Sequence, residues 1–188
     1  MRSKLALHFQ IGLPHWAERF YRDSGCQWGK LMDPGQDPPL PQLPHLHWVI
    51  RKHEQGHVCY AEVMAGAAGA EAQVQRIAPW LRARPWLAEA RFCFEHHNEF
   101  TNEGTLTTPY GRRASSAYGV RLTQLLGDQF GIRSVAGNLG VGHPEPHHGV
   151  EVCAAPMAAV RDREGYYSFH EYNWPDVGVA VSRDPKDG

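Results

Sequence analysis

The sequence has no excess of charge of either sign. Nineteen Lys and Arg residues stand against twenty Asp and Glu residues, which leaves a formal net charge of -1. Nucleic-acid-binding domains carry a basic surplus, so this balance argues against DNA or RNA as a partner. Apolar runs are also short. None reaches the roughly 20 residues of a membrane-spanning helix, and the first residues are too polar for a secretory leader. A cytoplasmic protein with no membrane partner is therefore expected.

Cysteine is scarce, and several common motifs are missing. The four cysteines are widely spread without a C-x-x-C pair, so we expect neither a disulfide framework nor a cysteine-based zinc site. No cysteine adjoins a plausible base, and no G-x-S-x-G is present, so no nucleophilic cysteine or serine is predicted. The cysteines are expected to be reduced and mostly buried as small hydrophobic residues. They are Cys26, Cys59, Cys93 and Cys153.

The length and composition of the chain predict one domain over residues 1–188, because 42% of the residues are hydrophobic and can form a core. Short apolar runs typical of strands alternate with stretches of helical periodicity. The predicted strands are 4–10, 28–32, 47–51, 91–95, 132–136 and 166–169. The predicted helices are 14–24, 69–82, 110–130 and 150–163. A proline-rich loop at 33–44 excludes regular structure between the second and third strands.

This alternation predicts an α/β fold with a parallel sheet. Each strand–helix unit takes about 30 residues, which is the pitch of a (β/α)₈ barrel. We therefore expect a (β/α) TIM-type barrel that is incomplete, with about six units. A doubly wound open sheet fits the length better, but no strand is followed by the Gly-rich phosphate-binding turn that many such folds carry.

Polar side chains collect where each predicted strand ends. Twelve histidines, six tryptophans and seven tyrosines suit a ligand cleft, and many of them fall near these positions. Because the carboxyl ends of parallel strands meet at one edge of a sheet, these side chains are expected to converge where active sites of βα folds lie. The set includes His8, Gln10, Asp33, Arg51, His53, Glu54, the run 95–99, Asn138, His143 and the run 170–172.

The fourth of these clusters is the most informative. The segment FCFEHHNE at 92–99 places Asn98 and Glu99 just beyond an apolar strand. Here the sequence resembles the retaining (β/α)₈-barrel glycoside hydrolases of the cellulase-related clan, whose fourth strand ends in Asn-Glu. The sixth strand of that group often carries His-x-Tyr, as in FHEY at 169–172, and the opening strand at 4–10 is also similar. By the order of elements, the resemblance extends to about residue 174.

The resemblance implies a catalytic pair and a carbohydrate substrate. Glu99 would be the general acid/base, and Asn98 would hydrogen-bond the sugar beside it. Such chemistry needs a carboxyl group that can protonate the leaving oxygen, and it needs no cofactor. The remaining residues are expected to line the substrate cleft. They are His8, Gln10, Arg51, His53, Asn138, His170, Glu171, Tyr172 and Trp174.

One departure from that group bears on the mechanism. Its nucleophile is a second Glu at the end of the seventh strand, whereas no seventh strand is predicted here and no glutamate follows Glu171. The chain is therefore expected to be a fragment of a longer barrel or a shortened barrel. A non-catalytic carbohydrate-binding barrel is the first alternative. The open edges of such a barrel would favour a homodimer.

A second alternative is a zinc-dependent hydrolase. Residues 53–57 read HEQGH, a form of H-E-x-x-H, which on a helix presents two zinc ligands on successive turns and a general base between them. His53 and His57 would be the ligands, Glu54 the base and Glu99 the third ligand. The motif directly follows a predicted strand, and Gly56 weakens a helix there. Zinc is expected as a cofactor only in this alternative.

Overall fold

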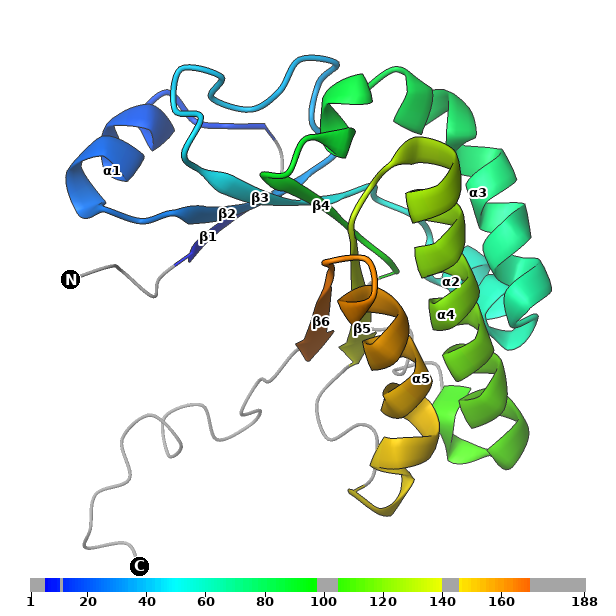
Figure 1. The fold of residues 1–188 in the computed structure, drawn as a ribbon. Helices are drawn as coiled ribbons and strands as arrows, with labels where there is room; N and C mark the ends of the chain where they lie inside the picture. Colours follow the sequence, from blue (N-terminus) through cyan, green and yellow to red (C-terminus); the bar gives the residue numbers. More distant parts are fainter. Residues whose placement is uncertain (1–5, 11, 98–104, 140–145, 170–188) are drawn as a thin grey trace, which may run out of the picture.

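The computed structural model describes residues 6–10, 12–97, 105–139 and 146–169, and these form an α/β fold (Figure 1). The six strands are β1 (Ala6–Phe9), β2 (Trp28–Met32), β3 (His47–Arg51), β4 (Phe92–Glu95), β5 (Ser134–Leu139) and β6 (Tyr166–Phe169). The α-helices of the described residues are α1 (Ala17–Ser24), α2 (Gly56–Met64), α3 (Ala67–Arg82), α4 (Pro109–Phe130) and α5 (Gly149–Arg161).

The six strands form one sheet in the order β1-β2-β3-β4-β5-β6, and every neighbouring pair is parallel. All six predicted strands are thereby confirmed. A doubly wound sheet requires a point where the strand order reverses, and this order has none. The doubly wound alternative is therefore wrong for this chain.

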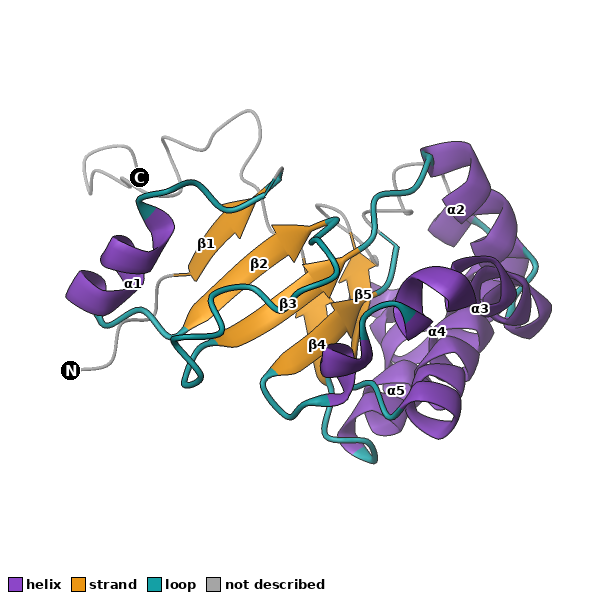
Figure 2. Cartoon of the chain, turned by 90° about the horizontal axis from the view of Figure 1, so that it is seen from above, coloured by secondary structure: helices purple, strands orange, loops and turns teal. Residues whose placement is uncertain are grey.

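One face of the sheet is covered by helices. Because side chains alternate along a strand, Trp48 and Phe94 share this face, as the β3–β4 register shows. Tyr21 of α1 packs against Trp48 with ring centroids 5.5 Å apart, and Trp80 of α3 packs against Phe94 at 6.0 Å. The helices α3, α4 and α5 lie side by side along this face (Figure 2). We call it the helix face.

The opposite face of the sheet is curved. Trp28 of β2 and Tyr166 of β6 both lie on it, and their ring centroids are only 5.4 Å apart. Four strand spacings separate β2 from β6, which is about 19 Å in a flat sheet and too far for these two side chains to bridge. The sheet must bend around this face, which we call the concave face. This curvature and the strand order are compatible with part of a (β/α) barrel.

The longest helix, α4, has clear signals at both ends. The hydroxyl of Thr108 accepts a hydrogen bond from the Gly111 amide, Pro109 occupies the first turn, and Gly131 ends the helix at φ 67°. These are the preferred N-cap, N1 and C′ residues of a helix. Its buried stripe includes Tyr118, Leu122, Leu125 and Leu126. Within the described ranges, no helix is both long and apolar enough to cross a membrane.

Gly29 lets an aromatic core pack against β2. A Cβ atom at this position would overlap the Trp48 ring and the Tyr21 hydroxyl, and both of those side chains are buried. We expect Gly29→Ala to lower the free energy of unfolding by about 1–3 kcal/mol through overpacking, as measured by urea denaturation. Gly35→Ala is the control, because a Cβ at Gly35 meets nothing within 4 Å. Equal effects of the two substitutions would contradict the packing account.

Candidate functional site at the carboxyl edge of the sheet

The parallel strands bring several predicted site residues to one edge. Arg51 is the last residue of β3, Glu95 is the last residue of β4, and Asn138 lies near the end of β5. All strands run in the same direction, so these positions share the carboxyl edge of the sheet. Six of the other predicted residues lie outside the described part of the chain. They are Asn98, Glu99, His170, Glu171, Tyr172 and Trp174.

A buried ion-pair cluster occupies the concave face at this edge. The Lys30 Nζ atom lies 2.7 Å from Glu95 Oε1, and Arg51 Nη1 lies 3.5 Å from Glu95 Oε2. The Lys30–Glu95 pair reaches across the intervening strand β3. The Glu95 side chain is only 2% exposed, and Lys30 and Arg51 are 19% and 10% exposed. The cluster therefore places two cations and one carboxylate in a partly dry environment, where charged hydrogen bonds are strong.

Lys30 was not among the predicted site residues. The available signal was its place at the centre of an otherwise uncharged strand, WGKLM, where a charge needs a partner. The partner is Glu95, 65 residues further along the chain.

Asn138 combines an unusual backbone conformation with a buried side-chain amide. Its φ is 50°, in the left-handed region, and it lies at a register shift between Gly137 and Leu139 where β5 pairs with β6. The side chain is fully buried, and neither its Nδ2 nor its Oδ1 atom has a hydrogen-bond partner within the described residues. Strained backbone, bulges and unsatisfied buried amides concentrate at binding and catalytic sites. Asn138 therefore has the properties of a ligand-binding residue.

His8, Gln10 and His53 are exposed side chains near the same edge. The β1–β2 register pairs His8 with Lys30, which puts His8 on the concave face. Gln10 follows β1, and His53 follows β3, where its amide donates to Asp33 Oδ1. All three are accessible to a ligand at this edge.

The HEQGH segment does not form the predicted zinc motif. Helix α2 begins at Gly56, so His53 precedes the helix while His57 lies in its first turn. Both histidines are exposed, and they do not stand on adjacent turns of one helix. The hypothesis of a zinc site built on this helical pair is therefore wrong in its geometry. The third residue of that hypothesis, Glu99, lies outside the described residues.

A second charged cluster surrounds His97, directly after β4. Its Nδ1 atom lies 3.2 Å from Glu54 Oε2, and its Nε2 atom lies 2.9 Å from Glu62 Oε2. Arg76 of α3 pairs with Glu54 and, through Nη2 at 2.8 Å, with Glu62. Gln73 also donates to Glu54. Four charged groups, from the segment after β4, α2, α3 and the loop before α2, thus meet in one network, in which His97, Glu54 and Glu62 are largely buried and Arg76 is 39% exposed.

The protonation of this network follows from its geometry. Burial alone would lower the pKa of His97, but Cys59, Glu54 and Glu62 raise it to about 10. Burial alone would raise the pKa of Glu54, but hydrogen bonds from His97 and Arg76 lower it to about 2. His97 is therefore an imidazolium at neutral pH. Its neighbour His96 is neutral, because burial and the charge of His97 lower its pKa to about 3.

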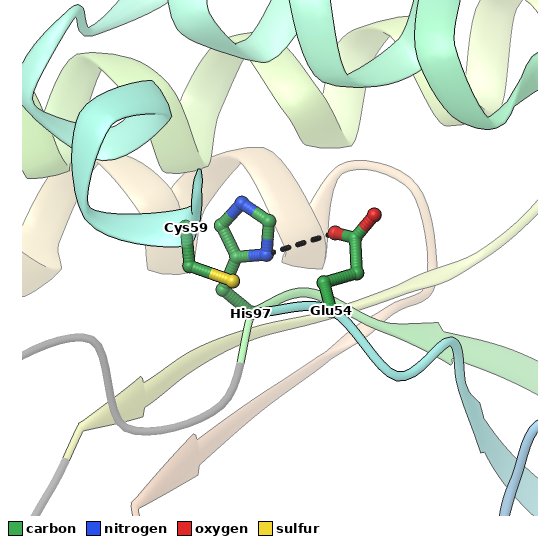
Figure 3. A group of neighbouring side chains, drawn as sticks. All are labelled: Glu54, Cys59 and His97. Atoms are coloured by element: carbon green, nitrogen blue, oxygen red, sulfur yellow. Dashed lines mark ion pairs between the residues drawn. The ribbon is translucent and has the colours of Figure 1, made fainter. Parts of the chain in front are cut away.

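Cys59 corrects the expectation that no cysteine adjoins a base. All four cysteines are free and buried, as predicted. The Cys59 sulfur, however, lies within 4.8 Å of ligand atoms of both Glu54 and His97 (Figure 3). Cys59 and His97 are 38 positions apart in the sequence, so the contact exists only through the fold.

Comparisons with family models, curated proteins and solved structures give no match. The site itself is therefore the basis for a functional conclusion.

Proposed function

We propose that the chain is a carbohydrate-active (β/α) barrel protein of the glycoside-hydrolase type, with its site at the carboxyl edge of the sheet. The observation that carries this proposal is the convergence at that edge of Lys30, Arg51, Glu95 and Asn138, whose amide has no partner among the described residues. Asn98 and Glu99 follow His97 directly in the sequence. Active sites of barrels built from βα units lie at this edge.

The roles proposed for Glu99 and Asn98 are those that the resemblance to retaining glycoside hydrolases implies. Glu99 would protonate the leaving oxygen, and Asn98 would hydrogen-bond the adjacent sugar hydroxyl. Lys30, Arg51 and Asn138 supply hydrogen-bond donors, as sugar hydroxyls require. His8 and Gln10 would extend the cleft along β1.

Binding without turnover is the second candidate function. Retaining hydrolysis needs a second carboxylate that can attack the sugar. Glu95 is a buried carboxylate at this edge, and it is already paired with Lys30 and Arg51. Such pairing favours a role in holding the site together over a role as a nucleophile.

A panel of chromogenic glycosides and unlabelled oligosaccharides tests the proposal, with hydrolysis followed by absorbance and binding by calorimetry. Hydrolysis supports the enzyme, and binding without hydrolysis supports the second candidate. If the protein neither hydrolyses nor binds any member of the panel, both candidate functions are contradicted. Lys30→Met should weaken the binding. Lys52→Met is the matched control, because within the described ranges the Lys52 ammonium donates only to the neighbouring His53 carbonyl.

Asn138→Gly separates function from stability. Glycine adopts φ 50° without strain and removes an unpaired buried amide, so we expect stability to stay the same or rise by up to about 1 kcal/mol. Sugar binding should weaken by about three- to tenfold, the equivalent of one lost hydrogen bond. Thermal denaturation and calorimetry measure the two effects. A clear loss of stability with unchanged binding would instead make Asn138 a structural residue.

A further inference from the structure

We propose that Glu54, Cys59 and His97 form a binding site for a zinc-like divalent transition metal ion. One ligand atom from each residue lies within 4.8 Å of the other two, and all three side chains point toward one another (Figure 3). They come from the loop before α2, from α2 itself and from the end of β4. This inference does not depend on the carbohydrate proposal, and it uses neither His53 nor His57.

The ligand distances are close to those of a zinc site. Zinc bonds of about 2.0–2.3 Å place tetrahedral ligand atoms roughly 3.3–3.8 Å apart. Glu54 Oε2 and His97 Nδ1 are already 3.2 Å apart. A metal ion would need to draw the Cys59 sulfur inward by up to about 1–1.5 Å, which a side-chain rotation can supply.

The second nitrogen of His97 is also arranged as in metal sites. A metal-bound histidine usually donates its other ring N–H to a carboxylate, which fixes the ring orientation. Here Glu62 Oε2 lies 2.9 Å from Nε2, which leaves Nδ1 to face Glu54 and Cys59. Arg76 holds Glu62 through two contacts of 2.8 and 2.9 Å. Glu62 would therefore orient the ligand without touching the metal.

The charge of the buried cluster is balanced with or without the metal. Without it, the His97 imidazolium and the Arg76 guanidinium offset the carboxylates of Glu54 and Glu62. Binding would break the Nδ1–H bond of His97 and the S–H bond of Cys59, and both protons would leave to solvent. Bonds from the metal to nitrogen, sulfur and the Glu54 oxygen would replace them. One divalent ion replaces two protons, so the net charge of the cluster stays at zero. Metal binding therefore buries no additional charge.

The ligand types select the metal. A thiolate and an imidazole suit zinc and cobalt, whereas magnesium and calcium prefer oxygen ligands alone. Three protein ligands leave a fourth position for water or another group.

Cobalt titration of the chelator-treated protein tests the site, because a cobalt–thiolate bond gives a charge-transfer band in the near ultraviolet. We expect the band to saturate at one equivalent of Co²⁺ and to disappear when one equivalent of Zn²⁺ is added. Cys59→Ser should abolish the band. Cys26→Ser is the matched control and should keep it, because Cys26 is equally buried but lies outside the cluster.

A second measurement covers the case in which Cys59→Ser does not fold. In the wild-type protein, stoichiometric zinc should slow alkylation of Cys59 relative to Cys26, as mapped by mass spectrometry under mild denaturation. Metal binding without the thiolate band would mean adventitious binding to exposed histidines, and it would overturn the proposal. Retention of the band in Cys59→Ser would also overturn it. So would an alkylation rate of Cys59, relative to that of Cys26, that zinc does not change.

Discussion

Replacing His97 by alanine is expected to lower the free energy of unfolding by about 3–5 kcal/mol. The substitution leaves the carboxylates of Glu54 and Glu62 facing each other across an empty space, with Arg76 as their remaining cation. The loss of an ion-pair partner from a buried network costs far more than the loss of one from the surface. Urea denaturation in the presence of a chelator measures the change.

His57→Ala provides the control for this prediction. His57 is an exposed histidine in the first turn of α2, so its removal should change the stability by less than about 0.5 kcal/mol. Similar effects of the two substitutions would show that the His97 network does not stabilise the fold.

The His97 effect should also depend on pH. The pKa of His97 is raised to about 10 in the folded protein, from an ordinary value of 6.5. A raised pKa contributes stability that is full below pH 6.5 and is lost as the pH rises toward 10. The difference between wild type and His97→Ala should therefore be largest below pH 6.5 and shrink above it. A difference that grows with pH over this range would contradict the assigned imidazolium.

Glu99→Gln is expected to lower kcat by about 10²–10⁴-fold on any glycoside that the wild-type protein hydrolyses. Glutamine keeps the size and polarity of the side chain but has no proton to give to the leaving oxygen. Binding of the sugar should remain within a few-fold of wild type. Steady-state kinetics and calorimetry on the same substrate measure both effects.

Glu89→Gln is the matched control for Glu99→Gln. Glu89 is an exposed carboxylate before β4, paired with Arg91 and remote from the carboxyl edge of the sheet. Its substitution should leave kcat unchanged. Full turnover by Glu99→Gln would assign the proton donor to another residue and would remove the main role that the family resemblance implies.

The sheet was largely predictable from the sequence. Strands β2, β3 and β6 have the predicted bounds, because each is a short apolar run with a turn or proline signal beside it. Helix α2 was missed. Its sequence GHVCYAEVM begins with glycine and contains β-branched and aromatic residues, which have low helix propensity. Burial of Cys59, Glu62 and Val63 against the rest of the fold outweighs that propensity.

The candidate site was predictable only in part. The carboxyl edge could be located because strand direction alone decides which ends converge, and Arg51 and Asn138 lie there as expected. The pairing of Lys30 with Glu95 could not be foreseen, because it depends on which residues face each other across β3. The Glu54–Cys59–His97 cluster joins segments on different elements, and no spacing rule links Cys59 to His97 in the sequence.

The most direct test of the central claim is amide chemical-shift mapping by NMR with the oligosaccharide that binds best in the panel. The account predicts that the shifts concentrate at the carboxyl ends of β2 to β5, around Lys30, Arg51, Glu95 and Asn138. The helix face, including Tyr21 and Trp80, should change little. Shifts confined to that face, or the absence of any binding sugar, would contradict a carbohydrate site at this edge.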